Sequence, residues 1–281
     1  PYLWLDDSGT LVGFEVDVMD AVARRLGVKA KMTHYNWVNL VPLLKRGDFD
    51  VVCNGLEATP DRAASILLSR PYFVYAETLA VRTGAPYRSL ADLKGKRVAT
   101  LDQTYALDLL KGAGVDIALY EDNQVIYDDL ALGRVDAVLL DNVIADRYGC
   151  NHAGVTCLPE DVARGTYVIG IRSQDPELKA AIDAALAAMT ADGELERILR
   201  KARLWDHRQT EPVPDVASGP PPPKRHFGAV QLRRFAAAAL VTLGLSVAAF
   251  LLAVPLGLVL AIGRVYGGRW LGAVARVYIE L

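Results

Sequence analysis

The chain has 281 residues, of which 52% are hydrophobic, and its formal net charge is −2 at pH 7. This length can bury a sizeable core and hold more than one structural unit, and a charge this close to zero gives no electrostatic case for nucleic-acid binding. The three cysteines include no CxxC pair, and together with four histidines they form no convincing metal-ligand cluster. We therefore expect no nucleic-acid partner, no metal and no cofactor.

The first part of the chain predicts alternating strands and helices. Leu11–Leu26 predicts a short strand and then an amphipathic helix, Lys29–His34 alternates like a strand, and Leu40–Lys45 predicts a helix. The apolar run Phe49–Cys53 is expected to be a buried strand of a mostly parallel sheet, and it breaks at Asn54-Gly55.

The next helix has a recognisable start. Thr59 is expected to be its N-cap, Pro60 its first residue, and Asp61 an acid in its first turn. Arg62 follows in that turn, where free backbone N–H groups and the helix dipole favour an anion. Since a guanidinium can hold a carboxylate through two parallel hydrogen bonds, Arg62 is either an anion-binding residue or a solvated residue of an amphipathic helix.

A repeated pattern predicts a second, similar lobe. The pattern LxxGxFDVV over residues 44–52 recurs as LxxGxVDAV over residues 130–138, so the chain twice predicts a helix end, a glycine turn and a buried strand. Ligands of open α/β sheets bind at the carboxyl ends of strands, so Asp141, at the end of the second strand, is expected to face Arg62 across a cleft. Such a pair suits the zwitterion of an α-amino acid, whereas the alternative for Asp141 is an ordinary N-cap.

The remaining elements of the first 206 residues complete the two lobes. In chain order, we expect a crossover strand at Leu79–Arg82, a second lobe over Thr83–Val162, a returning strand over Thr166–Arg172 and helices over Pro176–Trp205 with a break near Asp192-Gly193. Cys150 and Cys157 are either a disulfide or two free thiols, and Cys53 is expected to be a small buried apolar residue.

Five segments carry a family resemblance: DDSGTLVGFEVDVMDAVARRLG, GDFDVVCNGLEATPDR, SRPYFVYAETLAVR, SLADLKGKRVATL and GRVDAVLLDNVIA. In order and spacing they resemble the polar amino-acid family of periplasmic solute-binding proteins. The resemblance implies an α/β, two-lobed flytrap of periplasmic-binding-protein type II over residues 1–206, with lobe 1 at about 1–82 and 163–206 and lobe 2 at about 83–162. It implies a protein that closes on one amino acid and catalyses no reaction.

The resemblance also assigns roles in the site. It implies that Arg62 pairs with the substrate α-carboxylate, that Asp141 takes the α-ammonium, and that Trp37 walls the side-chain pocket, with core packing as the alternative for Trp37. The family's glycine-serine-threonine turn is replaced here by Gln103-Thr104-Tyr105, whose backbone N–H groups and Thr104 hydroxyl are expected to hold the carboxylate. The other candidate substrate-binding residues are Asn54, Gly55, Leu56, Glu57 and Tyr2.

Glu57 departs from the family, whose members commonly carry serine or threonine at this position. Burying a lone charge is costly, so its carboxylate is expected to pair with a cationic substrate side chain or with the α-ammonium. The alternative is a solvated glutamate at the rim of the cleft.

The composition changes after residue 206. Four consecutive prolines at 220–223 predict an extended linker over residues 207–230. The charge-free run Phe235–Gly263 of about 29 residues is long enough to span a bilayer, and basic residues on both sides leave its orientation open. The stretch from Leu232 resembles the start of permeases in polar amino-acid ABC importers, so residues 231–281 are expected to be the first transmembrane helix of a permease domain.

Together these resemblances imply import of a polar or charged L-amino acid by a binding protein fused to its permease. The expected location is the cell (inner) membrane with the binding domain on the periplasmic side. The expected partners are the amino-acid ligand, the lipid bilayer, a permease partner or second copy, and a cytoplasmic ABC ATPase that hydrolyses ATP. No secretory signal precedes Pro1, and the family's first strand and the permease sequence after Leu281 are not in the chain, so we expect a fragment truncated at both ends.

Two alternatives to import remain. The same flytrap followed by one membrane helix also serves as the ligand-sensing domain of transmembrane signalling receptors. An enzyme is the other alternative, but the sequence has no recognisable Ser/His or Cys/His pairing and no acid–base dyad outside the expected zwitterion site.

Overall fold

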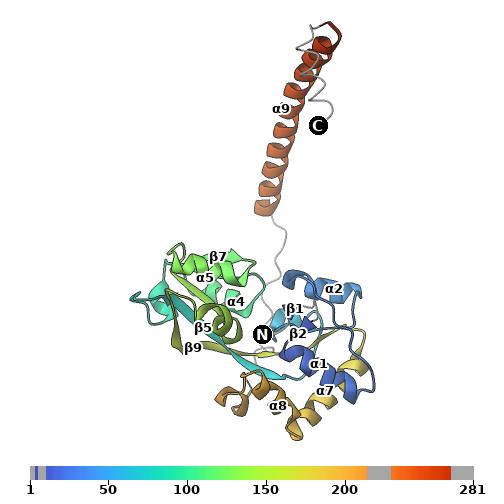
Figure 1. The fold of residues 1–281 in the computed structure, drawn as a ribbon, viewed down its shortest axis with the longest axis vertical. Helices are drawn as coiled ribbons and strands as arrows, with labels where there is room; N and C mark the ends of the chain where they lie inside the picture. Colours follow the sequence, from blue (N-terminus) through green and yellow to red (C-terminus); the bar gives the residue numbers. More distant parts are fainter. Residues whose placement is uncertain (1–3, 6–10, 214–228, 267–281) are drawn as a thin grey trace. The chain divides into compact units, whose positions relative to one another are not determined.

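A computed structural model describes residues 4–5, 11–213 and 229–266. The chain divides into two units, Pro1–Pro222 and Pro223–Leu281. In the first unit, two α/β lobes are joined by long strands that run through both of them (Figure 1). This arrangement confirms the two-lobed fold that the sequence predicts.

Lobe 1 is built on a short three-stranded sheet in the order β3-β10-β4. Its elements are β1 (Trp4–Leu5), β2 (Leu11–Val12), α1 (Phe14–Arg25), the 3-10 turn η1 (Trp37–Asn39), α2 (Leu40–Arg46), β3 (Val51–Val52), α3 (Pro60–Ala63), β4 (Leu67–Leu68), β10 (Gly170–Ile171), α7 (Pro176–Ala191) and α8 (Glu194–Lys201). Strand β10 runs antiparallel to both neighbours, so the expected mostly parallel sheet is wrong for the described part of lobe 1. The physical reason is that β10 comes from the returning crossover and meets β3 from the opposite direction.

Helices α1, α7 and α8 pack together on one side of lobe 1 (Figure 1). Their buried apolar side chains, such as Val18, Ile182 and Leu199, meet the start of the long strands. The chain turns between α7 and α8 at Gly193, whose φ of 73° lies in the left-handed region that glycine adopts without strain. The predicted break at this point is confirmed.

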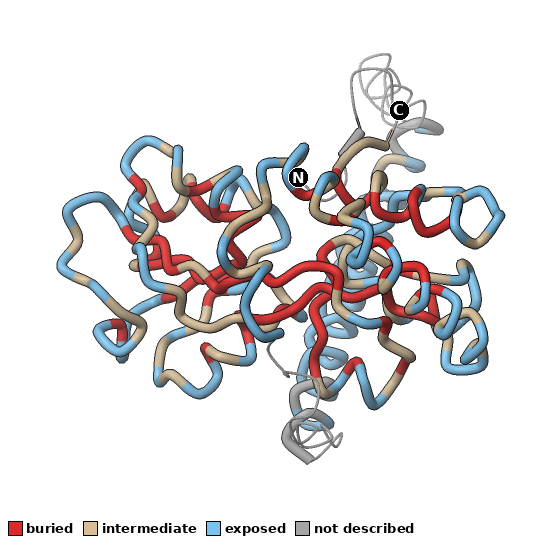
Figure 2. The backbone as a smooth tube through the Cα atoms, turned by 90° about the horizontal axis from the view of Figure 1, so that it is seen from below, coloured by how far each residue is buried: buried red, intermediate tan, exposed pale blue. Residues whose placement is uncertain are grey.

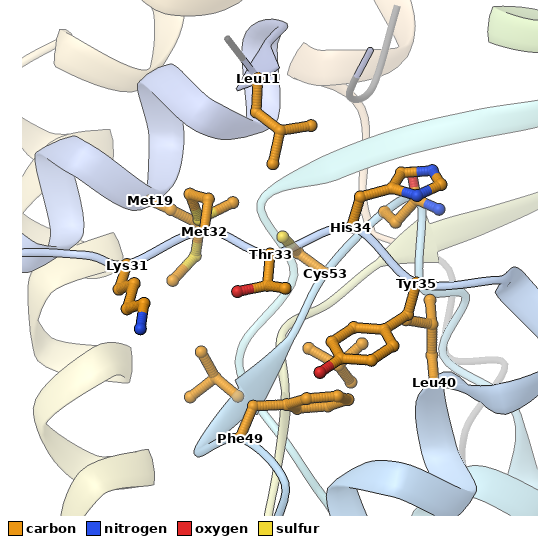
Figure 3. Close-up of a pocket in the computed structure, with 13 residues that line it drawn as sticks. Leu11, Met19, Lys31, Met32, Thr33, His34, Tyr35, Leu40, Phe49 and Cys53 are labelled. Atoms are coloured by element: carbon orange, nitrogen blue, oxygen red, sulfur yellow. The ribbon is translucent and has the colours of Figure 1, made fainter. Parts of the chain in front are cut away.

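The predicted strand Lys29–His34 is wrong: these residues adopt no strand in the described structure. A strand exists only where a neighbour accepts its backbone hydrogen bonds. This segment and β3 both border a cavity of about 100 Å³. Met32, Thr33 and Tyr35 border that cavity together with Phe49 and other residues (Figure 3). Polar and apolar side chains do alternate in this segment, but no described strand pairs with its backbone.

Lobe 2 contains a five-stranded sheet in the order β7-β6-β8-β5-β9. Its sheet includes the long crossover strands β5 (Phe73–Arg82) and β9 (Val155–Tyr167). Its other elements are η2 (Leu90–Leu93), β6 (Arg97–Leu101), α4 (Tyr105–Gly112), β7 (Asp116–Tyr120), α5 (Asn123–Ala131), β8 (Ala137–Asp141), α6 (Asn142–Ile144) and the π-helical turn η3 (Ala145–Gly149). Strand β6 pairs in parallel with β7 and β8, whereas β5 pairs antiparallel with β8 and β9. Apolar clusters fill both faces of this sheet.

The predicted internal repeat is present in the structure. Helix α2 ends at Gly47 with a φ of 92°, and α5 is followed by Gly133 with a φ of 73°. Each glycine provides the left-handed turn after a helix, and each turn leads into a buried strand, β3 in lobe 1 and β8 in lobe 2.

The first crossover strand is longer than predicted. The second begins earlier and ends at Tyr167, so the predicted strand Thr166–Arg172 is divided between β9 and β10. Strand β5 covers Phe73–Arg82 and β9 covers Val155–Tyr167, and their antiparallel pairing is interrupted by irregularities next to Thr78. Figure 2 shows buried backbone running through the middle of both lobes and along the strands that join them. The lobes therefore share a continuous buried connection.

The Cys150–Cys157 disulfide is formed, which decides between the two alternatives for this pair. It ties the residue after η3 to strand β9. The thiol of Cys53 is free, and its side chain packs against the core of lobe 1 as expected for a small apolar residue.

Residues beyond position 206, the expected end of the binding domain, still form contacts with the two lobes. The 3-10 turn η4 (His207–Thr210) follows, and the Gln209 side chain bonds the backbone of Val74 in β5 through both its oxygen, at 3.0 Å, and its nitrogen, at 2.8 Å. Arg208 forms an ion pair with Asp161 at 2.8 Å. The expected linker start at His207 is therefore too early.

The second unit contains one described helix, α9 (Ala229–Tyr266). Within it, Ala236–Ile262 is long and apolar enough to cross a membrane. Pro255 lies inside this helix, as proline often does in membrane helices.

Candidate functional site

A cavity of about 300 Å³ lies where side chains from both lobes meet. Lobe 1 contributes part of its lining, including Trp37, Asn54, Gly55 and Glu57. Lobe 2 contributes Leu101, Asp102, Thr104, Tyr120, Glu121, Asn123, Asp141, Ile144 and Tyr148. The cavity therefore brings together candidate residues that lie far apart in the sequence.

The wall from lobe 1 touches the turn before α4 in lobe 2. The Trp37 indole N–H donates to the Asp102 backbone oxygen at 3.1 Å, and the Arg62 Nη2 donates to the Gln103 backbone oxygen at 2.7 Å. The Arg62 guanidinium carbon lies 5.1 Å from the centre of the Trp37 ring, close enough for a cation–π contact. Trp37 is half-buried and lines the cavity. It contacts both Arg62 and the opposite lobe.

Arg62 is positioned by a short, capped helix. The Thr59 hydroxyl accepts the Arg62 backbone N–H at 3.4 Å, and Pro60 takes the first helical position, as the sequence predicts. Arg62 is only 9% exposed, so the alternative of a solvated surface residue is excluded. Its Nη1 donates to the backbone oxygen of Glu57 at 2.8 Å, which fixes the guanidinium beside the cavity.

The side chain of Glu57 is buried and paired within the protein. It is 3% exposed, so the alternative of a solvated rim residue is excluded. Its Oε2 accepts from Arg62 Nη1 at 3.2 Å and from the Tyr105 backbone N–H at 3.0 Å. Burial raises the pKa of Glu57 to about 7, with Arg62 acting to lower it and the charge of Asp141 acting to raise it.

Asp141 lies both at the cavity and at the start of a helix. It lines the cavity, and its Oδ1 caps α6 by accepting the Ile144 backbone N–H at 2.9 Å. Strand β8 ends at this residue, which places its carboxylate at the carboxyl edge of the sheet where ligands of such sheets bind.

The turn before α4 provides fewer free donors than the sequence suggests. The Thr104 hydroxyl caps α4 by accepting the Leu107 N–H at 3.2 Å, and it donates to the Leu101 backbone oxygen at 2.9 Å. The Tyr105 N–H already bonds Glu57. Thr104 lines the cavity, whereas Tyr105 meets the site through its backbone.

The remaining candidates divide into three groups. Asn54 and Gly55 line the cavity, and their φ angles of 101° and 66° place this turn in the left-handed region. The side chain of Leu56 packs in the core of lobe 1, and its backbone oxygen accepts the Val168 N–H at 2.8 Å. Tyr2 lies outside the described residues.

Two buried glutamates near the cavity are not predicted from the sequence. Glu15, on α1, accepts the Gly55 backbone N–H at 2.7 Å and the Tyr72 hydroxyl, so it fixes the turn that borders the cavity. Glu77, on β5, is 0% exposed and lies opposite Asp141 on the neighbouring strand. Burial, with the charges of Glu57 and Asp141, raises the pKa of Glu77 well above its usual value. An acid inside the apolar run Phe73–Arg82 is the sequence signal that could have identified Glu77.

The raised pKa of Glu15 predicts how the stability of lobe 1 depends on pH. Burial raises its pKa from 4.5 to about 7, and the hydrogen bonds from Tyr72 and Gly55 offset only part of this rise. Because the folded state holds this proton more tightly than the unfolded state, the resulting stability is full below about pH 4.5 and is lost as the pH rises through about 7, a change of about 3 kcal/mol. We expect Glu15→Gln to flatten the dependence of Tm on pH over this range.

Thermal unfolding of the purified chain across about pH 5 to 8 checks this expectation. Glu196→Gln is the matched control, because the Glu196 side chain is 41% exposed and, among the described ion pairs, pairs only with Arg200. An unchanged pH slope in Glu15→Gln would contradict the assignment.

Among the described residues, no group of three or more histidine, cysteine, aspartate or glutamate side chains has the geometry to hold a metal ion. The chemistry that this part of the chain offers at the cavity is recognition by paired charges, backbone donors and aromatic surfaces.

Comparison with known proteins agrees with this geometry. Residues 1–203 match the sequence profile of the bacterial extracellular solute-binding proteins, family 3. The chain is similar to the lysine/arginine/ornithine-binding periplasmic protein of Escherichia coli K12, with 29% identity over 214 residues that cover 72% of this chain and 82% of the relative. It is also similar to the L-cystine-binding protein TcyJ of the same strain, with 30% identity over 206 residues that cover 72% and 77%.

A solved structure shows the same fold. An ancestral arginine-binding protein bound to arginine is 33% identical, with a TM-score of 0.66, over 72% of this chain and 92% of that chain. The relatives compared here are binding proteins rather than enzymes. The chain belongs to the bacterial extracellular solute-binding proteins of family 3.

Proposed function

We propose that this chain captures one polar or charged L-amino acid in the cavity between its lobes, with a preference for a cationic side chain. The observation that carries this proposal is the lining of the cavity, which includes the carboxylates of Glu57, Asp102, Glu121 and Asp141. None of the described lining residues is a lysine or an arginine. A cation that leaves water for this cavity therefore meets compensating negative charge.

The two ends of the proposed ligand have separate partners. Arg62 takes the α-carboxylate and Asp141 takes the α-ammonium, while Trp37 and the tyrosines of lobe 2 cover the side chain. The similarity to a lysine/arginine/ornithine-binding protein and to an arginine-bound ancestral protein supports a cationic amino acid. The geometry required is modest, since a partner for the α-carboxylate, a partner for the α-ammonium and a wall for the side chain are enough to hold an amino acid.

We further propose that the captured amino acid passes to an ABC-importer permease in the cell (inner) membrane. The apolar helix segment Ala236–Ile262 supports membrane attachment, and the disulfide supports an oxidising compartment for the binding lobes. A short tether would hold the loaded lobes near their permease at an effective concentration on the order of millimolar. The partners in this scheme are a permease subunit or second copy and a cytoplasmic ATPase.

A ligand-sensing receptor is the second candidate, because the described residues contain one helix able to span a membrane and a sensor needs no more than one after its flytrap. The coding sequence downstream of Leu281 distinguishes the two functions. Further membrane helices would favour the permease, whereas a cytoplasmic coiled coil or kinase would favour the receptor.

Isothermal titration of the purified chain tests the ligand proposal. L-Arginine is expected to bind saturably with one site per chain, and N-acetyl-L-arginine, which lacks the α-ammonium, is expected to bind at least about tenfold more weakly because one charge-assisted hydrogen bond is lost. Equal binding of the two compounds would contradict the role proposed for Asp141.

A further inference from the structure

The carboxylate of Glu57 uses the same donors that the proposed function gives to the ligand carboxylate. Its Oε2 accepts from Arg62 Nη1 at 3.2 Å, within lobe 1, and from the Tyr105 backbone N–H at 3.0 Å, in lobe 2. One donor is the arginine at the start of α3, and the other is the first N–H of α4. A carboxylate that bridges these two groups therefore joins the lobes.

Arg62 makes further bonds with the protein itself. Besides Glu57, its guanidinium donates to the backbone oxygens of Glu57, at 2.8 Å, and Gln103, at 2.7 Å. Its face lies against Trp37, and Arg62 is not among the residues that line the cavity. Both Nη1 hydrogens are directed at Glu57, so an incoming carboxylate competes with Glu57 for that side of the guanidinium.

The position of Glu57 in the chain explains this pairing. It lies five residues before Arg62, and an isolated bridge from Glu57 to Tyr167 holds its backbone against the end of strand β9. The side chain is thereby held against α3 on one side and the start of α4 on the other. Charge-assisted hydrogen bonds such as these are roughly twice as strong as neutral ones, so displacing them lowers the net gain from a ligand carboxylate.

We propose that Glu57 is an internal competitor for the ligand α-carboxylate and so determines how strongly the cavity distinguishes an amino acid from the amine that lacks this carboxylate. The inference rests on the proposed function of the same cavity. With Glu57 in place, a carboxylate on the ligand gains less, because Glu57 shares Arg62 Nη1 and the Tyr105 N–H with it. With Glu57 neutralised, competition for Arg62 and the Tyr105 N–H weakens, and the amino acid gains affinity relative to the amine.

The test compares L-arginine with agmatine, the amine that remains when the α-carboxylate is removed. Dissociation constants for both are measured on the full chain and on Glu57→Gln, which keeps the size of the side chain but removes its charge. The ratio of the arginine Kd to the agmatine Kd is expected to fall by at least about tenfold in Glu57→Gln, because a neutral amide competes less well than a carboxylate.

Glu121→Gln is the matched control. Glu121 lines the same cavity, so this change removes an equal charge without releasing Arg62 or the Tyr105 N–H. Its Kd ratio is expected to stay within about threefold of the unsubstituted chain. An equal fall in both variants would mean that only the total charge of the cavity matters, which would overturn the proposal.

Two other outcomes separate the inference from the proposed function. If both ligands bind and Glu57→Gln leaves the ratio unchanged, Glu57 is not a competitor, while capture of a cationic ligand stands. If neither ligand binds to any folded variant, the proposed function fails and the inference fails with it. Glu57→Asp, which withdraws the carboxylate by one methylene, is expected to lower the ratio in the same direction and replaces Glu57→Gln if that variant does not fold.

Discussion

Arg62→Ala is expected to weaken amino-acid binding by about two to three and a half decades in Kd, which corresponds to roughly 3–5 kcal/mol. The loss is this large because it leaves buried carboxylates without their cation. Arg62 is 9% exposed, pairs with Glu57 and bonds the Gln103 backbone of the other lobe, so solvent cannot replace it cheaply. Equilibrium titration of L-arginine into the wild-type chain and the variant measures the effect.

Arg46→Ala is the control for this experiment. Arg46 is exposed, lies at the end of α2 and pairs only with Asp48 among the described ion pairs, so its loss is expected to leave the Kd within about threefold. Circular dichroism and Tm establish that both variants are folded. A loss below about tenfold in a folded Arg62→Ala would remove Arg62 from the proposed site.

Asp141→Asn is expected to weaken binding by about 10-fold to 150-fold, the range of a hydrogen bond to a charged group of roughly 1.5–3 kcal/mol. The substitution is nearly isosteric, and the amide oxygen can still accept the Ile144 N–H and cap α6. The variant therefore removes the charge that we propose faces the ligand ammonium, while it keeps the helix cap.

Selectivity distinguishes Asp141 from the other carboxylates of the cavity. Every amino acid carries the α-ammonium, so Asp141→Asn should weaken L-arginine and L-glutamine by the same factor. Asp102→Asn, which changes a second carboxylate of the cavity lining, should weaken arginine more than glutamine. A loss confined to arginine in Asp141→Asn would mean that Asp141 faces the side chain of the ligand rather than its ammonium.

Local features of the sequence predict the parts of the fold that depend on a few neighbouring residues. The cap and first turn at Thr59 and Pro60 follow from side-chain chemistry within one turn, and the glycine turns at Gly47 and Gly133 follow from the backbone freedom that they require. These features place Arg62 at the start of a helix and Asp141 at the end of a strand without knowledge of the fold.

Features that depend on distant partners could not be predicted in the same way. Lys29–His34 has the alternation of a strand, yet no described neighbour pairs with its backbone. Glu15 has the position of an ordinary acid in the first turn of a helix, and only the approach of Gly55 and Tyr72 from elsewhere in the chain shows that it is buried. Side-chain periodicity shows which face of an element is apolar, but it does not identify the distant residues that pair with or pack against that element.

Glu57 illustrates the same limit inside the site. The resemblance marks it as unusual, and the cost of a buried charge predicts that it needs a partner. The expected partner is a cationic group of the ligand, whereas in the structure the partners are Arg62, five residues away, and the Tyr105 N–H in the other lobe. The pairing depends on how the loop between β3 and α3 folds and on how lobe 2 meets it, which no local pattern encodes.

The most direct test of the account is a thermal-shift series on the purified chain with each proteinogenic amino acid. A ligand present at about 100 times its Kd should stabilise the folded state by about 2.7 kcal/mol, which gives a measurable rise in Tm. The account predicts a rise with cationic amino acids, largest for arginine or lysine, that Asp141→Asn diminishes. No rise with any amino acid would contradict the proposed amino-acid capture.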